Sequence, residues 1–195
     1  MFLTPGRREI GAIAHYTGLL VASLALGMLF PLVTALVAHE WDPALDYALG
    51  IGVAAALGMA LAQAAPRGTP LSRRDALLVT ALAWFSASLV AAVPLSLSGH
   101  YGSFIDAYFD AMSGLTTSGL TLAQDLDHMA LAHNMWRHLT HLIGGQGIIV
   151  AALSVAVGLK GGGAVSLYMA EARDERILPN VMHTARFIWF VTAVY

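Results

Sequence analysis

The sequence predicts an all-α integral membrane protein, and three observations support this fold class. Of the 195 residues, 57% are hydrophobic and only 11% are charged, whereas soluble domains usually carry about 25% charged residues. Several apolar segments reach the roughly 20 residues that a helix needs to cross a bilayer. The basic residues gather on one side of these segments. A net charge of −2 and the lack of cysteine argue against a nucleic-acid partner and a disulfide framework.

Four segments are long and apolar enough to span, and we expect helices at residues 10–38, 46–65, 76–98 and 134–159. Pro31 should bend the first of them. That segment is much longer than the core of a signal peptide, so we expect it to be retained. A fifth apolar segment begins near Ala185, and the sequence ends before this segment could cross.

The distribution of charge predicts the topology. Nine of the ten Lys and Arg residues lie before the first span, between the second and third, or after the fourth, and only Arg137 lies on the other side. The positive-inside rule therefore places the N-terminus in the cytoplasm. Residues 99–133 must then begin and end outside the cell.

Within this outer stretch, residues 103–115 (SFIDAYFDAMSGL) predict a helix that is too short to cross. Ser103 followed by Asp106 resembles a capping box. The next residues, TTSG, predict irregular backbone at membrane depth, which is tolerated where it lines a water-filled path. Carbonyl oxygens of such backbone can replace the water around K⁺, and Gly119 permits a positive φ there. The pattern indicates a re-entrant pore unit; the alternative is an amphipathic outer loop with an ordinary glycine turn.

The stretch DAYFDAMSGLTTSGLT, followed by WRHLTHLIGGQGIIVAALSV, resembles the first pore repeat of the Trk/Ktr/HKT potassium-uptake superfamily, closest to its TrkH-like subunits. The resemblance implies two leading transmembrane helices (1–66) and a helix–pore-loop–helix repeat like that of potassium channels (67–160). Its pore helix would be about 103–115 and its filter 116–120. Residues 161–195 would form a cytoplasmic linker and the start of a second repeat. Because the family has four repeats, we expect the chain to be a fragment.

By the same resemblance, the K⁺ selectivity filter comprises Thr117, Ser118 and Gly119, with Thr116 and Leu120 flanking. The implied function is K⁺ uptake across the cell (inner or plasma) membrane, with no cofactor besides the transported K⁺. The implied partners are a cytosolic nucleotide-binding regulatory subunit, TrkA-like, and a second copy of the full-length protein in a homodimer.

Other residues have more than one interpretation. Asp106 and Asp110 lie on the pore helix, and Arg137 lies near the pore mouth, where it could position or repel cations, pair with Asp110 or extend to lipid headgroups. Small residues permit close helix packing, or are ordinary membrane glycines; those in the fourth span are Gly144, Gly145 and Gly147.

Two alternatives to a K⁺ pore remain at this stage. One is an enzyme, but we expect no structural metal site, because His128, His133, His138 and His141 make an incomplete ligand set. No pairing of a nucleophile with a base is visible either, so we expect no enzyme. The alternative function is a secondary transporter that binds a small solute at a broken helix near mid-membrane.

Overall fold

The computed structural model describes residues 6–65, 73–158 and 190, and all regular structure in this part of the chain is helical. The elements are α1 (Arg7–Gly27), α2 (Leu29–Val37), α3 (Trp41–Ala62), α4 (Arg73–Leu97), α5 (Phe104–Leu115), the 3₁₀ turn η1 (Leu126–His128) and α6 (Leu131–Gly158). The chain divides into two compact units, 1–142 and 143–195. The predicted linker at 161–195 lies outside the described residues, apart from Phe190.

The predicted spans correspond to observed helices. Among the described residues, three segments are long and apolar enough to cross a membrane: Arg8–Val37, Trp41–Ala62 and Asp75–Leu97. These match the first three predicted spans, and α6 occupies the position of the fourth. The first span is divided into α1 and α2 at Met28. Pro31 accounts for the break, because it has no N–H to donate to the carbonyl of Gly27 one turn earlier.

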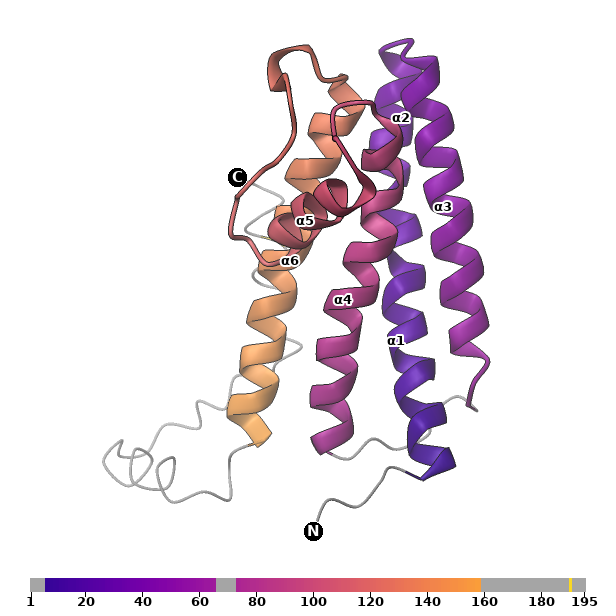
Figure 1. Cartoon of the computed structure of the whole chain (residues 1–195). Helices are drawn as coiled ribbons and strands as arrows, with labels where there is room; N and C mark the ends of the chain where they lie inside the picture. The colour runs from indigo at the N-terminus through magenta and orange to yellow at the C-terminus, as the bar shows by residue number, and fades with distance from the viewer. Residues whose placement is uncertain (1–5, 66–72, 159–189, 191–195) are drawn as a thin grey trace, which may run out of the picture. The chain divides into compact units, whose positions relative to one another are not determined.

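The first unit is built on a close crossing of α1 and α3. A Cβ added at Gly58 of α3 would lie 2.5 Å from the backbone nitrogen of Ala22, and one added at Gly18 would meet the backbone nitrogen of Ala62 at the same distance. Glycine is therefore required on both helices for this approach. Helix α4 packs against α1 and α3 (Figure 1).

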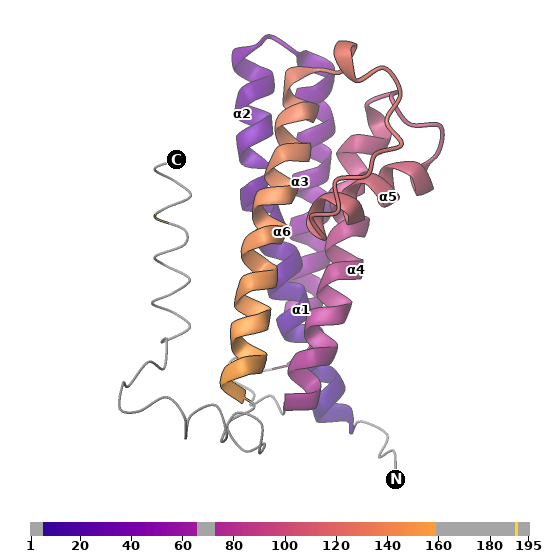
Figure 2. The ribbon, with the colours of Figure 1, turned by 90° about the vertical axis from the view of Figure 1, so that its left-hand side faces the viewer.

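The short helix α5 runs across its neighbours rather than along them (Figure 2). Its first turn is capped by Ser103, whose side chain accepts a hydrogen bond from the backbone N–H of Asp106, as the sequence predicts. Residues 116–130 then return to the end of the unit at which α4 finishes, where α6 begins (Figure 1). The segment between α4 and α6 therefore begins and ends at the same end of the unit, and its entry into the membrane remains a prediction.

The first unit buries large side chains from several of its helices. Trp136, Tyr47 and Leu95 are almost fully buried. Large apolar side chains such as Phe30, Val37 and Phe85 are instead exposed on the outside of the helices. This pattern suits a chain that lipid surrounds, because lipid tails are as apolar as the side chains that they contact.

Candidate functional site

The end of α5 is closed by a Schellman motif. The N–H of Thr117 donates to the carbonyl of Gly114 (3.0 Å), and the N–H of Ser118 donates to the carbonyl of Ser113 (3.0 Å). Thr117 occupies the left-handed position of the motif, with φ 58°. These bonds satisfy the last carbonyls of the helix and turn the backbone sharply away from its axis.

Residues 116–120, which we call the filter segment, follow this turn in an unusual backbone conformation. Gly119 has φ 75°, and Thr117 also has a positive φ, whereas Ser118 between them does not. A positive φ is rare for a β-branched residue such as threonine and indicates a conformation imposed by its surroundings. All five residues are exposed. The described part of the chain therefore does not cover these residues.

Hydroxyl groups hold the start of the filter segment to α5. The side-chain oxygens of Ser113 and Ser118 are 3.0 Å apart, and the hydroxyl of Thr116 donates to the carbonyl of Met112 at 2.8 Å. Ser113 is buried. Short polar side chains thus fix the turn by local hydrogen bonds.

The first turns of α6 lie against α5 and the filter segment. A Cβ added at Gly114 would lie 2.2 Å from the hydroxyl oxygen of Thr140, so only glycine permits this contact. A Cβ at Gly119 would lie 3.9 Å from the Nε2 atom of His141. The Nδ1 atom of His141 is hydrogen-bonded to the carbonyl of Arg137 at 2.7 Å. The filter segment is therefore supported by α5 on one side and by α6 on another.

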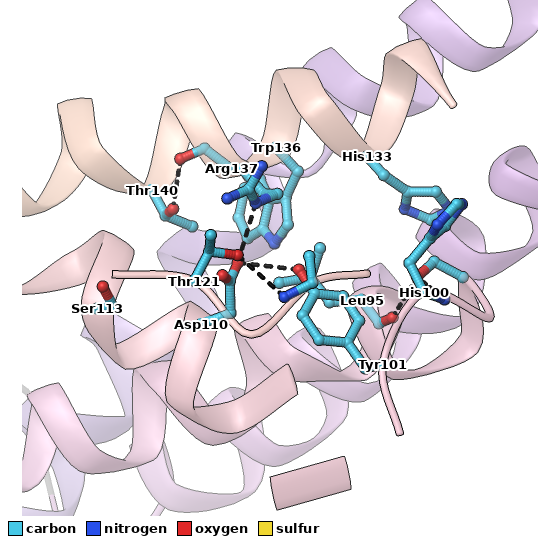
Figure 3. A network of polar contacts seen from close by, with 12 residues as sticks. Leu95, His100, Tyr101, Asp110, Ser113, Thr121, His133, Trp136, Arg137 and Thr140 are labelled. Carbon is cyan, nitrogen blue, oxygen red and sulfur yellow. Dashed lines mark hydrogen bonds and ion pairs between the residues drawn. The ribbon is translucent and has the colours of Figure 1, made fainter. Parts of the chain in front are cut away.

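A buried ion pair joins α5 to α6. The Nε of Arg137 donates to Oδ2 of Asp110 at 3.0 Å, and the Tyr101 hydroxyl donates to the same oxygen at 2.9 Å. Figure 3 shows both groups converging on Asp110. The side chains of Arg137 and Asp110 are only 17% and 4% exposed. Of the interpretations open for Arg137, the structure therefore favours the pair with Asp110 over a side chain that reaches lipid headgroups.

The electrostatics of this cluster follow from its burial. Burial, then the negative charge of Asp110 and the hydrogen bond to it, raises the pKa of the Tyr101 hydroxyl. Tyr101 therefore remains a donor at physiological pH. The charge of Arg137 is compensated at short range, so this arginine does not present an isolated positive charge to a cation. The other carboxylate oxygen of Asp110, Oδ1, is buried and accepts no hydrogen bond from the described residues.

The remaining predicted site residues are dispersed. Asp106 is half-buried in the first turn of α5. Gly144, Gly145 and Gly147 lie in α6 within the second unit, and their packing role remains a prediction. The histidines have separate partners: His128 contacts Asp125, and His133 contacts Tyr47. Within residues 6–65, 73–158 and 190, no three His, Cys, Asp or Glu side chains are arranged to hold a metal ion.

Sequence reasoning missed two features of this site. The hydrogen bond from Tyr101 to Asp110 is not predicted from the sequence, although Tyr101 lies just before the capped helix that carries Asp110. The left-handed conformation of Thr117 was also unexpected. No local signal indicates it, since threonine disfavours that conformation.

The chain is similar to known cation transport proteins. The model of the TrkH family, described as a cation transport protein, matches residues 47–195. The chain is 34% identical over 187 residues to the Trk system potassium uptake protein TrkH of Halomonas elongata, covering 93% of this chain and 38% of that protein. It is 30% identical over 186 residues to the Trk system potassium uptake protein TrkG of Escherichia coli, with 93% and 38% covered.

A solved structure is also similar. The crystal structure of the potassium transporter TrkH from Vibrio parahaemolyticus superposes with a TM-score of 0.76 at 26% identity, covering 95% of this chain and 36% of that chain. The chain thus spans well under half the length of these relatives. The family match includes α5, the filter segment and α6. On this evidence the chain belongs to the TrkH family of cation transport proteins.

Proposed function

We propose that the complete protein containing this chain takes up K⁺ through a channel-like pore and that the filter segment supplies part of its selectivity filter. The relatives named above are potassium uptake proteins. The observation that carries the assignment of the filter is the exposed segment after α5, in which Thr117 and Gly119 both have positive φ. Such a backbone can direct successive carbonyl oxygens toward an ion.

The surroundings of the filter segment also suit a cation. The C-terminal end of α5, which carries the partial negative charge of a helix dipole, leads directly into it. The nearby arginine, Arg137, is paired with Asp110. A ring of carbonyls completed by other repeats would replace the hydration shell of K⁺ without an opposing charge behind this part of the ring.

The same proposal includes the placement of the chain. The N-terminus lies in the cytoplasm and the re-entrant segment faces outward, which the asymmetry of basic residues supports. The membrane is the inner or plasma membrane. Residues 1–66 are the leading helices, 67–160 the first pore repeat, and 161–195 the link to a second. The complete protein forms a homodimer that binds a TrkA-like nucleotide-binding subunit at its cytoplasmic face.

The substitution Gly119→Ser in the complete protein tests the filter. A left-handed conformation costs a residue with a Cβ about 1–2 kcal/mol, so the carbonyls should turn away from their ring. A Cβ has room there, since its nearest neighbour would be 3.9 Å away, so the fold should survive. We expect the ratio of K⁺ to Na⁺ uptake to fall several-fold in cells deficient in K⁺ uptake, at matched protein levels.

Gly99→Ser is the matched control. Gly99 has φ 74°, with nothing within 4 Å of an added Cβ, and it lies outside the filter segment. It should bear the same backbone strain without a change of selectivity. An unchanged ratio for Gly119→Ser at normal expression would contradict the assignment of the filter and favour an ordinary outer loop.

A further inference from the structure

Helix α6 has no cap of its own at its first turn. The carbonyl of Ala130 accepts the first hydrogen bond of the helix, from the N–H of Asn134 at 3.1 Å, so Ala130 occupies the N-cap position. Alanine has no side-chain acceptor and is a poor N-cap. The first N–H groups of a helix nevertheless need acceptors.

The acceptor comes from a distant part of the chain, the turn between α2 and α3. The carboxylate of Glu40 accepts from the N–H of Leu131 at 2.8 Å and from the N–H of Ala132 at 3.1 Å. These groups are 91 and 92 residues apart in sequence. A carboxylate here also interacts favourably with the positive end of the helix dipole.

The backbone of Glu40 is held in place for this contact. Its N–H donates to the carbonyl of Ala35 at 2.8 Å, and the N–H of His39 donates to the carbonyl of Leu36 at 3.3 Å. His39 has φ 59°, so the turn is a second Schellman motif, again with a residue other than glycine at the left-handed position. The backbone position of Glu40 is thus set by the end of α2, which places its side chain within reach of α6.

Further contacts bind α3 to the next turn of α6. His133 is 3.4 Å from Asp46 and 3.2 Å from the hydroxyl of Tyr47. The ring of Tyr47 also meets Trp136 edge-on, with centroids 6.2 Å apart. The residue after Trp136 is Arg137, which pairs with Asp110 of α5. A continuous series of contacts therefore runs from Glu40 along the first turns of α6 to α5, the helix that leads into the filter segment.

We propose that Glu40 is a positioning residue for ion selection: it caps α6 and so sets the place of Arg137, which holds α5, the helix that leads into the filter segment. The leading helices, which lie outside the predicted pore repeat, would then contribute to selectivity through this cap. The proposal rests on the proposed K⁺ pore for its effect on selectivity. The cap itself can be tested without ion flow.

The test uses hydrogen exchange and ion uptake on the complete protein. Glu40→Ala should make the amides of Leu131 and Ala132 exchange about fivefold faster, the effect of losing about 1 kcal/mol of capping. It should also lower the ratio of K⁺ to Na⁺ uptake. Glu40→Gln keeps one acceptor oxygen and should give smaller changes, so it remains informative if the alanine variant does not fold.

Rescue by a local cap separates positioning from a general loss of stability. Ala130→Asp places an acceptor at the N-cap itself and, combined with Glu40→Ala, should restore both slow exchange and selectivity. Asp42→Asn is the control. Asp42 is an exposed acid two residues from Glu40, and this substitution removes the same charge as Glu40→Ala. It should change neither measurement.

Two outcomes would overturn the proposal. Unchanged exchange in Glu40→Ala would show that the carboxylate does not cap α6. Faster exchange with unaltered selectivity would show that the cap does not position the filter. A parent protein without K⁺ uptake would instead overturn the proposed function, and the exchange measurements would still decide whether Glu40 caps α6.

Discussion

Breaking the pair between Asp110 and Arg137 should destabilise the contact between α5 and α6 and alter ion selection. Asp110→Asn is the cleanest perturbation. The asparagine keeps an oxygen that can accept from Arg137 and Tyr101, and its amide nitrogen can occupy the place of Oδ1, which has no hydrogen-bond partner among the described residues. The charge of Asp110 is therefore removed with little change of shape.

The stability lost in Asp110→Asn follows from the burial of the ion pair. Removing one partner of a fully buried ion pair costs about 3–5 kcal/mol, because the other charge is left uncompensated. Arg137 retains 17% of its exposure, so solvent can relieve part of this cost. We therefore expect a loss of about 3 kcal/mol and a measurable fall in Tm.

A double-mutant cycle with Asp110→Asn and Arg137→Gln provides the assay. Thermal unfolding of the purified complete protein and the ratio of K⁺ to Na⁺ uptake are measured for both single variants and the double variant. Because the double variant leaves no uncompensated charge, we expect it to be little worse than either single, with a coupling energy of about 2 kcal/mol. Purely additive effects on Tm would refute the argument that the two residues act as one unit.

Two further predictions concern the helices. Gly58→Ala should lower the stability of the fold by about 1–3 kcal/mol, because the new Cβ would lie 2.5 Å from the backbone of α1. Gly52→Ala, whose new Cβ would have nothing within 4 Å, should be neutral or stabilising. Thermal unfolding in detergent compares the two variants, and equal effects would contradict the close crossing. Asp42→Cys and Asp125→Cys should react with an impermeant thiol reagent on intact cells, and Arg73→Cys only after permeabilisation; labelling of the last on intact cells would contradict the topology.

Local chemistry was sufficient to predict much of the fold from the sequence. The lengths of the apolar segments anticipated α1–α4 and the position of α6, because helix length is tied to bilayer thickness. Ser103 predicted the start of α5, since a cap depends only on residues within one turn. Gly119 was recognised as a residue suited to positive φ, and the structure confirms that conformation.

Only the tertiary structure decided which groups meet. Asp110 and Arg137 are 27 residues apart, and Glu40 and Leu131 are 91 apart. Periodicity indicates which residues share a face of a helix, but it does not specify how two helices are rotated or shifted against each other.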